Sequence, residues 1–509
     1  MLSKSITPAV SGPIAGLLLC APLLVSCSVL GLGQEEEPAT VIVGTPGALE
    51  VGDPYYPGSG SGGIDAQLYD LDLSVDMESG ALVARAVIDL RATQDLSAFS
   101  LDFGVFEIGS LSIDGDEAQY RRDGNELIIT LAQPLAEGTD FRCEVEYSGV
   151  PGLIPDASLA KFGLPGVGWW KMSSGIYTLS ECVGAASWFP CNDHPTDKAR
   201  LRLRVTVDEP WVVAANGLLV EEVIGTGANG LEQRTYQFDA RDPMATYLAT
   251  VNIARFNVTL EEGPEGLPLV LYAPLDAKEK ELAAFARTGE MITYFSELFG
   301  PYPFECFGGV ISYEQVGGAL ETQTLPVYSR GAGEGVVAHE LAHQWFGNAV
   351  SIERWEDLWL NEGFASYAEL LWVEHTDGKE AMEKRAARSY RSQLQRRTGA
   401  PHDPGVANLW SARAYQRGSV LLHALRGEIG DDLFFEVLRQ WVARNLHGNA
   451  NTAEFIALTE ELAKRELDEF FDVYLYGEML PVITTPAGSG PGGKTGEAET
   501  PADTDSGGL

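Results

Sequence analysis

Residues 336–346 read Val-Val-Ala-His-Glu-Leu-Ala-His-Gln-Trp-Phe and place His339 and His343 four positions apart in an apolar-periodic stretch. The pattern predicts a helix, in which residues four apart are separated by about 6 Å along the axis and project from one face. Both imidazoles can therefore reach one tetrahedral metal ion. Glu340 lies beside that face, where its carboxylate can take a proton from metal-bound water.

A third ligand is expected from Glu362, with eighteen residues between it and His343. A catalytic zinc uses three protein ligands and keeps one position open for water. The intervening chain is long enough to end the first helix near Gly347, cross a loop at 349–354 and begin a second helix that returns to the metal. A helix with two surface histidines and no metal is the simpler alternative for the first stretch alone, and Glu362 argues against it.

These residues resemble the aminopeptidase N family of gluzincin metallopeptidases, which also contains leukotriene hydrolase. Both the HExxH helix and the NEGFASYxE helix of that family are intact. The resemblance implies one zinc ion per chain, bound by His339, His343 and Glu362, with Glu340 activating zinc-bound water. Tyr415, in Tyr-Gln-Arg-Gly, resembles the family's YxKG signature, whose tyrosine stabilises the tetrahedral oxyanion. A phenol near its normal pKa suits that role, since it donates a hydrogen bond without ionising.

Two further glutamates are assigned to substrate binding by the same resemblance. Glu321 lies in Gly-Ala-Leu-Glu-Thr, residues 318–322, which is similar to the family's GAMEN exopeptidase motif. Glu181 precedes a Trp-Phe-Pro-Cys-Asn-Asp segment by the spacing of the family's second amine-binding acid. An aminopeptidase needs such carboxylates to pair with the substrate ammonium and to set its register. Gly318 and Ala319 are expected to contact the substrate as well.

The sequence departs from the family pattern at four of these neighbouring positions. Leu320 replaces methionine, which conserves volume, and Thr322 replaces asparagine. Leu179 stands where many members carry a polar amide near the amine. His194 replaces a glutamate, and we interpret it as a structural residue.

The resemblance implies a multidomain fold, with a saddle-like antiparallel β domain followed by a thermolysin-like, mainly α catalytic domain. Apolar residues alternate with polar ones in runs such as 201–207, which is typical of half-buried strands, and helical periodicity prevails in the second half. We place the β domain at 64–258 and the zinc peptidase domain at 259–485. The remaining 486–509 is rich in Pro, Gly, Thr and acidic residues, which predicts a disordered tail. The larger members continue into a helical domain that roofs the site, and without it the cleft is expected to be open.

The N-terminus resembles a bacterial lipoprotein signal. Lys4 precedes an apolar run at 9–25, and Leu-Val-Ser-Cys at 24–27 resembles a lipobox. The prediction is a signal peptide at 1–26 and an extracytoplasmic protein held to the cell membrane by a lipid on Cys27. Residues 27–63 are then anchor and flexible spacer, because they are acidic and rich in Pro and Gly. A secreted protein with an ordinary signal peptide is the alternative.

Composition limits the partners. The formal net charge is -38, which argues against nucleic acid and anionic lipid surfaces because both repel an acidic protein. The resemblance to the aminopeptidase N family implies peptides with a free amino terminus as substrates and a metalloaminopeptidase as the activity, and we expect no obligate protein partner. The alternatives are an epoxide hydrolase of the leukotriene type, which uses the same zinc, and a non-catalytic binding module on the same fold.

Overall fold

The computed structural model describes residues 42–482 of the 509-residue chain. The expected signal peptide at 1–26, the anchor at Cys27 and the tail at 486–509 lie outside the described residues. Within the described range, no helix is long and apolar enough to cross a membrane.

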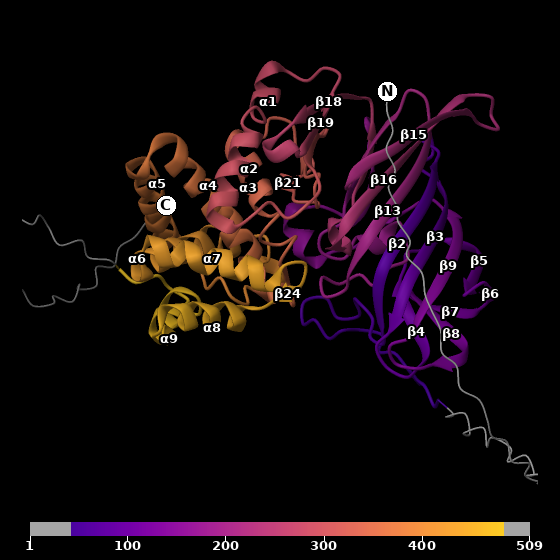
Figure 1. Ribbon diagram of the computed structural model, residues 1–509, viewed down its shortest axis with the longest axis horizontal. Coiled ribbons are helices and arrows are strands. Elements are labelled where there is room, and N and C mark those ends of the chain that lie inside the picture. The colour runs from indigo at the N-terminus through magenta and orange to yellow at the C-terminus, as the bar shows by residue number, and fades with distance from the viewer. Residues whose placement is uncertain (1–41, 483–509) are drawn as a thin grey trace, which may run out of the picture. The chain divides into compact units, whose positions relative to one another are not determined.

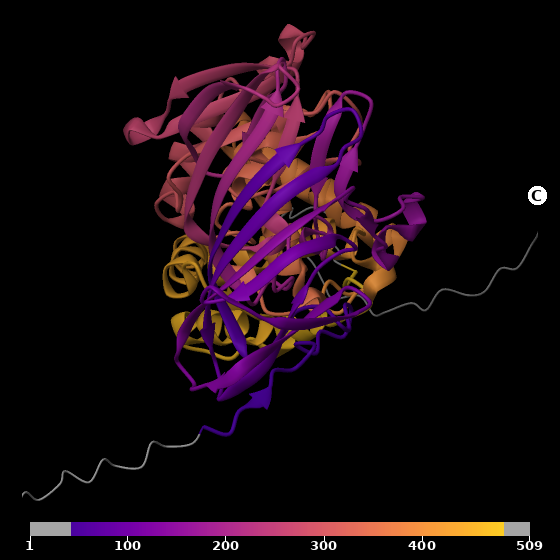
Figure 2. The same ribbon diagram turned by 90° about the vertical axis from the view of Figure 1, so that its right-hand side faces the viewer.

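A large β sheet dominates the first half of the described chain (Figures 1 and 2). Its eight strands lie in the order β15 (Leu218–Thr226), β16 (Glu232–Ala245), β13 (Lys198–Asp208), β2 (Ile64–Val75), β3 (Leu82–Ala92), β9 (Asp140–Gly149), β5 (Glu107–Ile113), β6 (Asp116–Glu117). Neighbouring strands are antiparallel, as predicted, except β13 and β2, which run parallel. Leu71 and Leu73 alternate with exposed residues along β2, which confirms one buried face.

Two smaller sheets share the hydrophobic core of the large one. The first consists of β1 (Thr45–Pro46), β4 (Leu96–Asp102), β8 (Glu126–Leu135) and β7 (Gln119–Asp123). The second consists of β10 (Leu153–Ile154), β11 (Val167–Lys171), β12 (Gly175–Leu179), β17 (Val251–Ala254) and β14 (Val212–Ala215). Strand β12 ends two residues before Glu181, so this second sheet carries one of the predicted site residues.

A mixed sheet begins the second half of the chain. Its strands are β18 (Phe256–Glu262), β19 (Pro268–Pro274), β20 (Phe307–Ile311), β22 (Val327–Tyr328) and β21 (Ala319–Leu320). The boundary expected after residue 258 falls inside β18, and because β18 pairs with β19, the whole strand belongs to the second half. Strand β21 lies directly before Glu321, which places a second predicted site residue at the edge of this sheet.

Helices make up most of the remaining second half (Figure 1). They are α1 (Glu279–Ala283), α2 (Thr288–Phe299), α3 (Glu334–Ala342), α4 (Trp359–Asp377), α5 (Lys379–Arg396), α6 (Gly418–Ile429), α7 (Asp431–Asn445), α8 (Thr452–Ala463) and α9 (Asp468–Tyr474), with a short parallel pair, β23 (Ser351–Ile352) and β24 (Asn449–Ala450). Helix α4 is buried along most of its length, between α3, α5 and α6. A helix that is apolar on several sides is stable only in such a central position.

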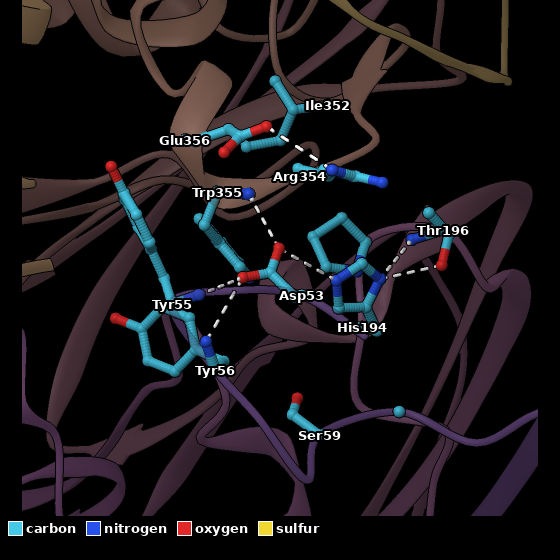
Figure 3. A network of polar contacts seen from close by, with 12 residues as sticks. Asp53, Tyr55, Tyr56, Ser59, His194, Thr196, Ile352, Arg354, Trp355 and Glu356 are labelled. Carbon is cyan, nitrogen blue, oxygen red and sulfur yellow. Dashed lines mark hydrogen bonds and ion pairs between the residues drawn. The ribbon is translucent and has the colours of Figure 1, made fainter. Parts of the chain in front are cut away.

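Residues 42–63 are part of the fold, so the prediction of a flexible spacer was wrong for this stretch. Asp53 is 3% exposed, and its Oδ2 accepts a hydrogen bond of 3.0 Å from the backbone N–H of Trp355. Its Oδ1 accepts bonds of 2.8 and 3.2 Å from the N–H groups of Tyr55 and Tyr56. The Nε2 of His194 lies 3.5 Å from Asp53 Oδ2 (Figure 3), which agrees with a structural role for that histidine.

We call residues 53–61 the N-terminal strap, because they contact both halves of the chain. Tyr55 Oη donates to Asp403 Oδ1 and accepts from the N–H of Gly405 in the second half. The N–H of Gly60 donates to Asp102 Oδ2 in the first half. Gly60 has φ +72°, and a Cβ there would lie 2.7 Å from the Cβ of His194. The glycine therefore lets the strap pass close to the His194 side chain, and composition alone does not distinguish this use of glycine from chain flexibility.

Candidate active site

His339, His343 and Glu362 bring three metal-ligand atoms together. His339 lies in α3, His343 is the first residue after that helix, and Glu362 lies in the first turn of α4. The Nε2 atoms of the two histidines lie 3.1 and 3.5 Å from Oε2 of Glu362. Ligands about 2.0–2.1 Å from a tetrahedral zinc ion lie about 3.3 Å from one another. The donor set and its spacing therefore fit zinc.

Both imidazoles are oriented by hydrogen bonds on their other nitrogen. Nδ1 of His339 lies 2.8 Å from Oε1 of Glu369, and Nδ1 of His343 lies 3.1 Å from the carbonyl oxygen of Phe346. These contacts leave Nε2 of each ring free to face the metal position. Sequence analysis missed Glu369. Its position seven residues after Glu362, two helical turns along the same face of α4, was the signal that could have found it.

Glu340 and Tyr415 lie beside the three ligands. A carboxylate oxygen of Glu340 lies within 4.8 Å of ligand atoms of His343 and Glu321. The Tyr415 ring lies nearly parallel to that of His339, at 11° and 6.1 Å between centroids. Burial, and then the Glu362 carboxylate, raises the pKa of Tyr415 well above its usual value. The phenol stays protonated and remains a hydrogen-bond donor.

Two glycines allow Tyr415 to approach the metal ligands. Tyr415 lies in a single π-helical turn, Arg413–Arg417, which continues into α6. A Cβ on Gly418 would lie 2.8 Å from the Cα of Gly363 in α4. The backbones of α4 and α6 therefore touch where Glu362 and Tyr415 project. Only glycine permits this approach, which explains why the Tyr-Gln-Arg-Gly segment ends in a glycine, Gly418.

Glu181 and Glu321 approach the metal ligands from the two halves of the chain. Their carboxylate oxygens and one of Glu362 all lie within 4.8 Å of one another. Both acids are buried, and Oε1 of each has no hydrogen-bond partner among the described residues. Burial, and then the neighbouring Glu321, raises the pKa of Glu181, and burial also raises that of Glu321. Buried carboxylates without partners are costly unless positive charge lies nearby, so this cluster is suited to holding a cation.

All residues assigned from the sequence surround one cavity of about 520 Å³. They are Glu181, Gly318, Ala319, Glu321, His339, Glu340, His343, Glu362 and Tyr415. Thr322, one of the departures from the family pattern, donates its hydroxyl to the carbonyl of Leu325 at 2.6 Å, so it is bonded within its own loop. The fold thus brings the predicted site residues together around one cavity, and their individual roles stay predictions.

Comparison with known proteins shows the family of this chain. Residues 65–248 match the Peptidase M1 N-terminal domain, and residues 308–474 match the Peptidase family M1 domain. An M1 zinc metallopeptidase from Deinococcus radiodurans has a similar structure, with a TM-score of 0.79 and 30% identity over 87% of this chain and 100% of that chain. The chain belongs to peptidase family M1.

Curated M1 relatives are more distant and longer. Aminopeptidase M1 of Arabidopsis thaliana is 23% identical over 458 residues, which cover 82% of this chain and 50% of the plant protein. Glutamyl aminopeptidase of Homo sapiens is 26% identical over 339 residues, which cover 62% of this chain and 35% of the human protein. This M1 chain thus spans half or less of the length of these relatives.

Zinc is the metal of this M1 protein. The similar solved structures are zinc metallopeptidases, and the nitrogen and oxygen donors of His339, His343 and Glu362 are those that zinc accepts at catalytic sites. The hydrogen bonds that His339 and His343 donate to Glu369 and to the Phe346 carbonyl fit such a site, since zinc-binding histidines nearly always donate their second N–H to such acceptors.

Proposed function

We propose that this protein is a zinc-dependent aminopeptidase that hydrolyses the N-terminal bond of peptides with a free amino terminus. The observation that carries the proposal is the position of Glu181 and Glu321, whose carboxylates lie within 4.8 Å of an oxygen of the ligand Glu362. An endopeptidase has no use for two buried acids so near its metal. A substrate ammonium paired with them has its first peptide bond beside the three ligands.

The surrounding residues have separate tasks in this reaction. Zinc, when bound, acts as a Lewis acid on water and on the peptide carbonyl. Glu340 takes a proton from the attacking water and transfers it to the leaving amine. The protonated Tyr415 donates a hydrogen bond to the carbonyl oxygen as negative charge develops there. Pairing of the ammonium with Glu181 and Glu321 fixes which bond is presented to these groups.

The alternative functions are less well supported. An epoxide hydrolase acting on a lipid does not need acids that pair with an ammonium, and the curated relatives are named aminopeptidases. A non-catalytic module is expected to lack a ligand, the base or the tyrosine. His339, Glu340, His343, Glu362 and Tyr415 are all present around the cavity.

Hydrolysis of chromogenic aminoacyl amides, with and without a zinc chelator, tests the proposed activity. We expect hydrolysis that the chelator abolishes and that added zinc restores. N-acetylated peptides are expected to be poor substrates, because an acetyl group removes the charge that Glu181 and Glu321 recognise. Equal cleavage of free and acetylated peptides at internal bonds would overturn the aminopeptidase proposal and leave the metal site intact.

We also propose that the mature protein is a lipoprotein, anchored outside the cytoplasm through Cys27. Support comes from the apolar run at 9–25 and from the lipobox-like Leu-Val-Ser-Cys at 24–27. Replacing Cys27 with serine is expected to move the protein from the membrane fraction to the soluble fraction with unchanged catalysis. Retention of the Cys27→Ser variant in membranes would instead indicate an uncleaved apolar segment.

A further inference from the structure

The cavity continues from the amine-binding acids into an apolar region. Leu179, the last residue of β12, precedes Glu181 by two positions, and both residues line the cavity. The ammonium and the side chain of a peptide's first residue branch from the same Cα. A substrate whose ammonium pairs with Glu181 therefore places its first side chain next to the residues around Leu179.

The walls of this region are made of apolar side chains. Trp170 of β11 and Met172 just beyond it line the cavity together with Leu179 and Val316. Met172, Leu179 and Val316 are partly buried and pack against one hydrophobic cluster, which holds them in place. Trp410 also lines the cavity and is fixed by a hydrogen bond of 2.7 Å from its Nε1 to Ser158 Oγ. We call this set the apolar wall.

The charges around the cavity belong to the metal and amine sites. The charged or ionisable lining residues are Glu181, Glu321, His339, Glu340, His343, Glu362 and Tyr415. Among the described lining residues there is no lysine or arginine, and Gln315 is the one neutral amide. Away from the metal, an acidic first side chain would therefore meet acids and apolar atoms and find no lysine or arginine to pair with, which is costly in a partly dry site.

We propose that the apolar wall selects peptides whose first residue has a large apolar side chain, such as Leu, Met or Phe, and excludes acidic first residues. Leu179 is the specificity-determining residue, because among the residues of the apolar wall it stands closest in the chain to the amine-binding Glu181. This inference rests on the proposed aminopeptidase function and adds the substrate class. A large apolar side chain gains free energy when it moves from water to the apolar wall, whereas a glycine has no side chain to cover the wall, which then stays hydrated.

Matched substrates test the selection. Leucyl, asparaginyl and aspartyl p-nitroanilides have first side chains of nearly the same shape and differ in polarity and charge. We expect kcat/KM for the leucyl amide to exceed that for the asparaginyl amide by about 10- to 100-fold, and the aspartyl amide to be poorer still. Equal values for the leucyl and aspartyl amides would overturn the inference and leave the aminopeptidase proposal standing. Failure of every aminoacyl amide would overturn both.

Variants at Leu179 test the assignment to this residue. Leu179→Arg adds a cation to the apolar wall and is expected to shift the aspartyl-to-leucyl ratio of kcat/KM upward by at least about tenfold. Leu179→Gln is a smaller change and is expected to lower the ratio of kcat/KM for the leucyl amide to kcat/KM for the asparaginyl amide. Leu260→Arg is the matched control, since Leu260 is 72% exposed on β18, away from the cavity lining. If both Leu179 variants hold a normal amount of zinc and their kcat/KM ratios equal those of the wild type, the assignment of selectivity to Leu179 is overturned.

A binding measurement gives a readout that does not depend on turnover. Free L-leucine is expected to raise the melting temperature of the zinc-loaded protein at concentrations where L-aspartate has no effect. Leu179→Arg is expected to reduce the difference between the melting-temperature shifts caused by L-leucine and by L-aspartate, whereas Leu260→Arg is expected to preserve that difference. Equal stabilisation by the two amino acids would contradict an apolar selection at this wall.

Discussion

Replacing Asp53 with alanine is expected to destabilise the folded protein by about 3 kcal/mol or more. Asp53 accepts hydrogen bonds from the backbone N–H groups of Tyr55, Tyr56 and Trp355 and lies 3.5 Å from Nε2 of His194 (Figure 3). A buried donor left without an acceptor costs about 1–3 kcal/mol. Three such donors at the lower end of that range give the expected value, which is a large part of the 5–15 kcal/mol typical of folded proteins.

The charge of Asp53 adds a pH dependence to this prediction. Burial alone would raise the pKa of Asp53, but hydrogen bonds from His194, Trp355 and Tyr55 outweigh it and lower the pKa below the ordinary value. A carboxyl whose pKa is lower in the folded state stabilises the protein above its unfolded pKa of about 3.9. That stabilisation is lost as the pH falls through the folded value, so at pH 7 it is fully present.

Urea unfolding at pH 7, followed by tryptophan fluorescence, measures the effect. Tyr56 and Tyr247 pack against the Trp355 ring, which makes this region visible to the probe. Asp53→Asn is expected to lie between wild type and Asp53→Ala, because it keeps one oxygen for two of the three donors. Asp116→Ala is the control, since Asp116 is exposed on β6 and its loss should cost less than about 0.5 kcal/mol. An Asp53→Ala variant as stable as Asp116→Ala would refute the reasoning.

Four further substitutions test the site. Glu362→Gln is expected to lose zinc and activity together, measured by metal analysis and amide hydrolysis, because three ligands leave no spare donor. Glu369→Gln should weaken zinc affinity about 10- to 100-fold in chelator competition, because His339 loses its orienting partner. Glu321→Gln should keep the zinc and lower kcat/KM for free peptides about 100-fold or more. Tyr415→Phe should leave zinc content and KM nearly unchanged and lower kcat about 100-fold or more. Normal turnover of Glu362→Gln, Glu321→Gln or Tyr415→Phe, or an unchanged zinc affinity of Glu369→Gln, would remove the role assigned to that residue.

The metal ligands could be predicted because their geometry is encoded locally. His339 and His343 share a helix face because they are four residues apart. The eighteen residues between His343 and Glu362 are enough for the chain to reverse direction and return to the metal. Glu181 and Glu321 carry no such pattern, since each is one acid among 73. They were found only through the resemblance to a family, and the structure then placed both beside Glu362.

Other features depend on contacts between distant parts of the chain, which no local pattern reveals. The N-terminal strap has the composition of a linker, yet Tyr55 is hydrogen-bonded to Asp403, 348 positions away. The apolar wall likewise combines Trp170, Leu179 and Trp410 from both halves of the chain. Each of these side chains taken alone is an ordinary core residue, and only the fold shows that they face one cavity.

The two halves of the chain supply different residues of the site. The residues assigned to the chemistry, from His339 to Tyr415, all belong to the second half, whereas Leu179 and Glu181 belong to the first. Lys198 of β13 joins them, since its Nζ donates to the carbonyl oxygens of Asn348, Ala349 and Gly448, the first two just beyond the metal-binding helix. Because Leu179 and Glu181 lie on a different segment from the residues assigned to hydrolysis, substitutions around Leu179 can alter which peptides are bound while the metal ligands and the base keep their positions.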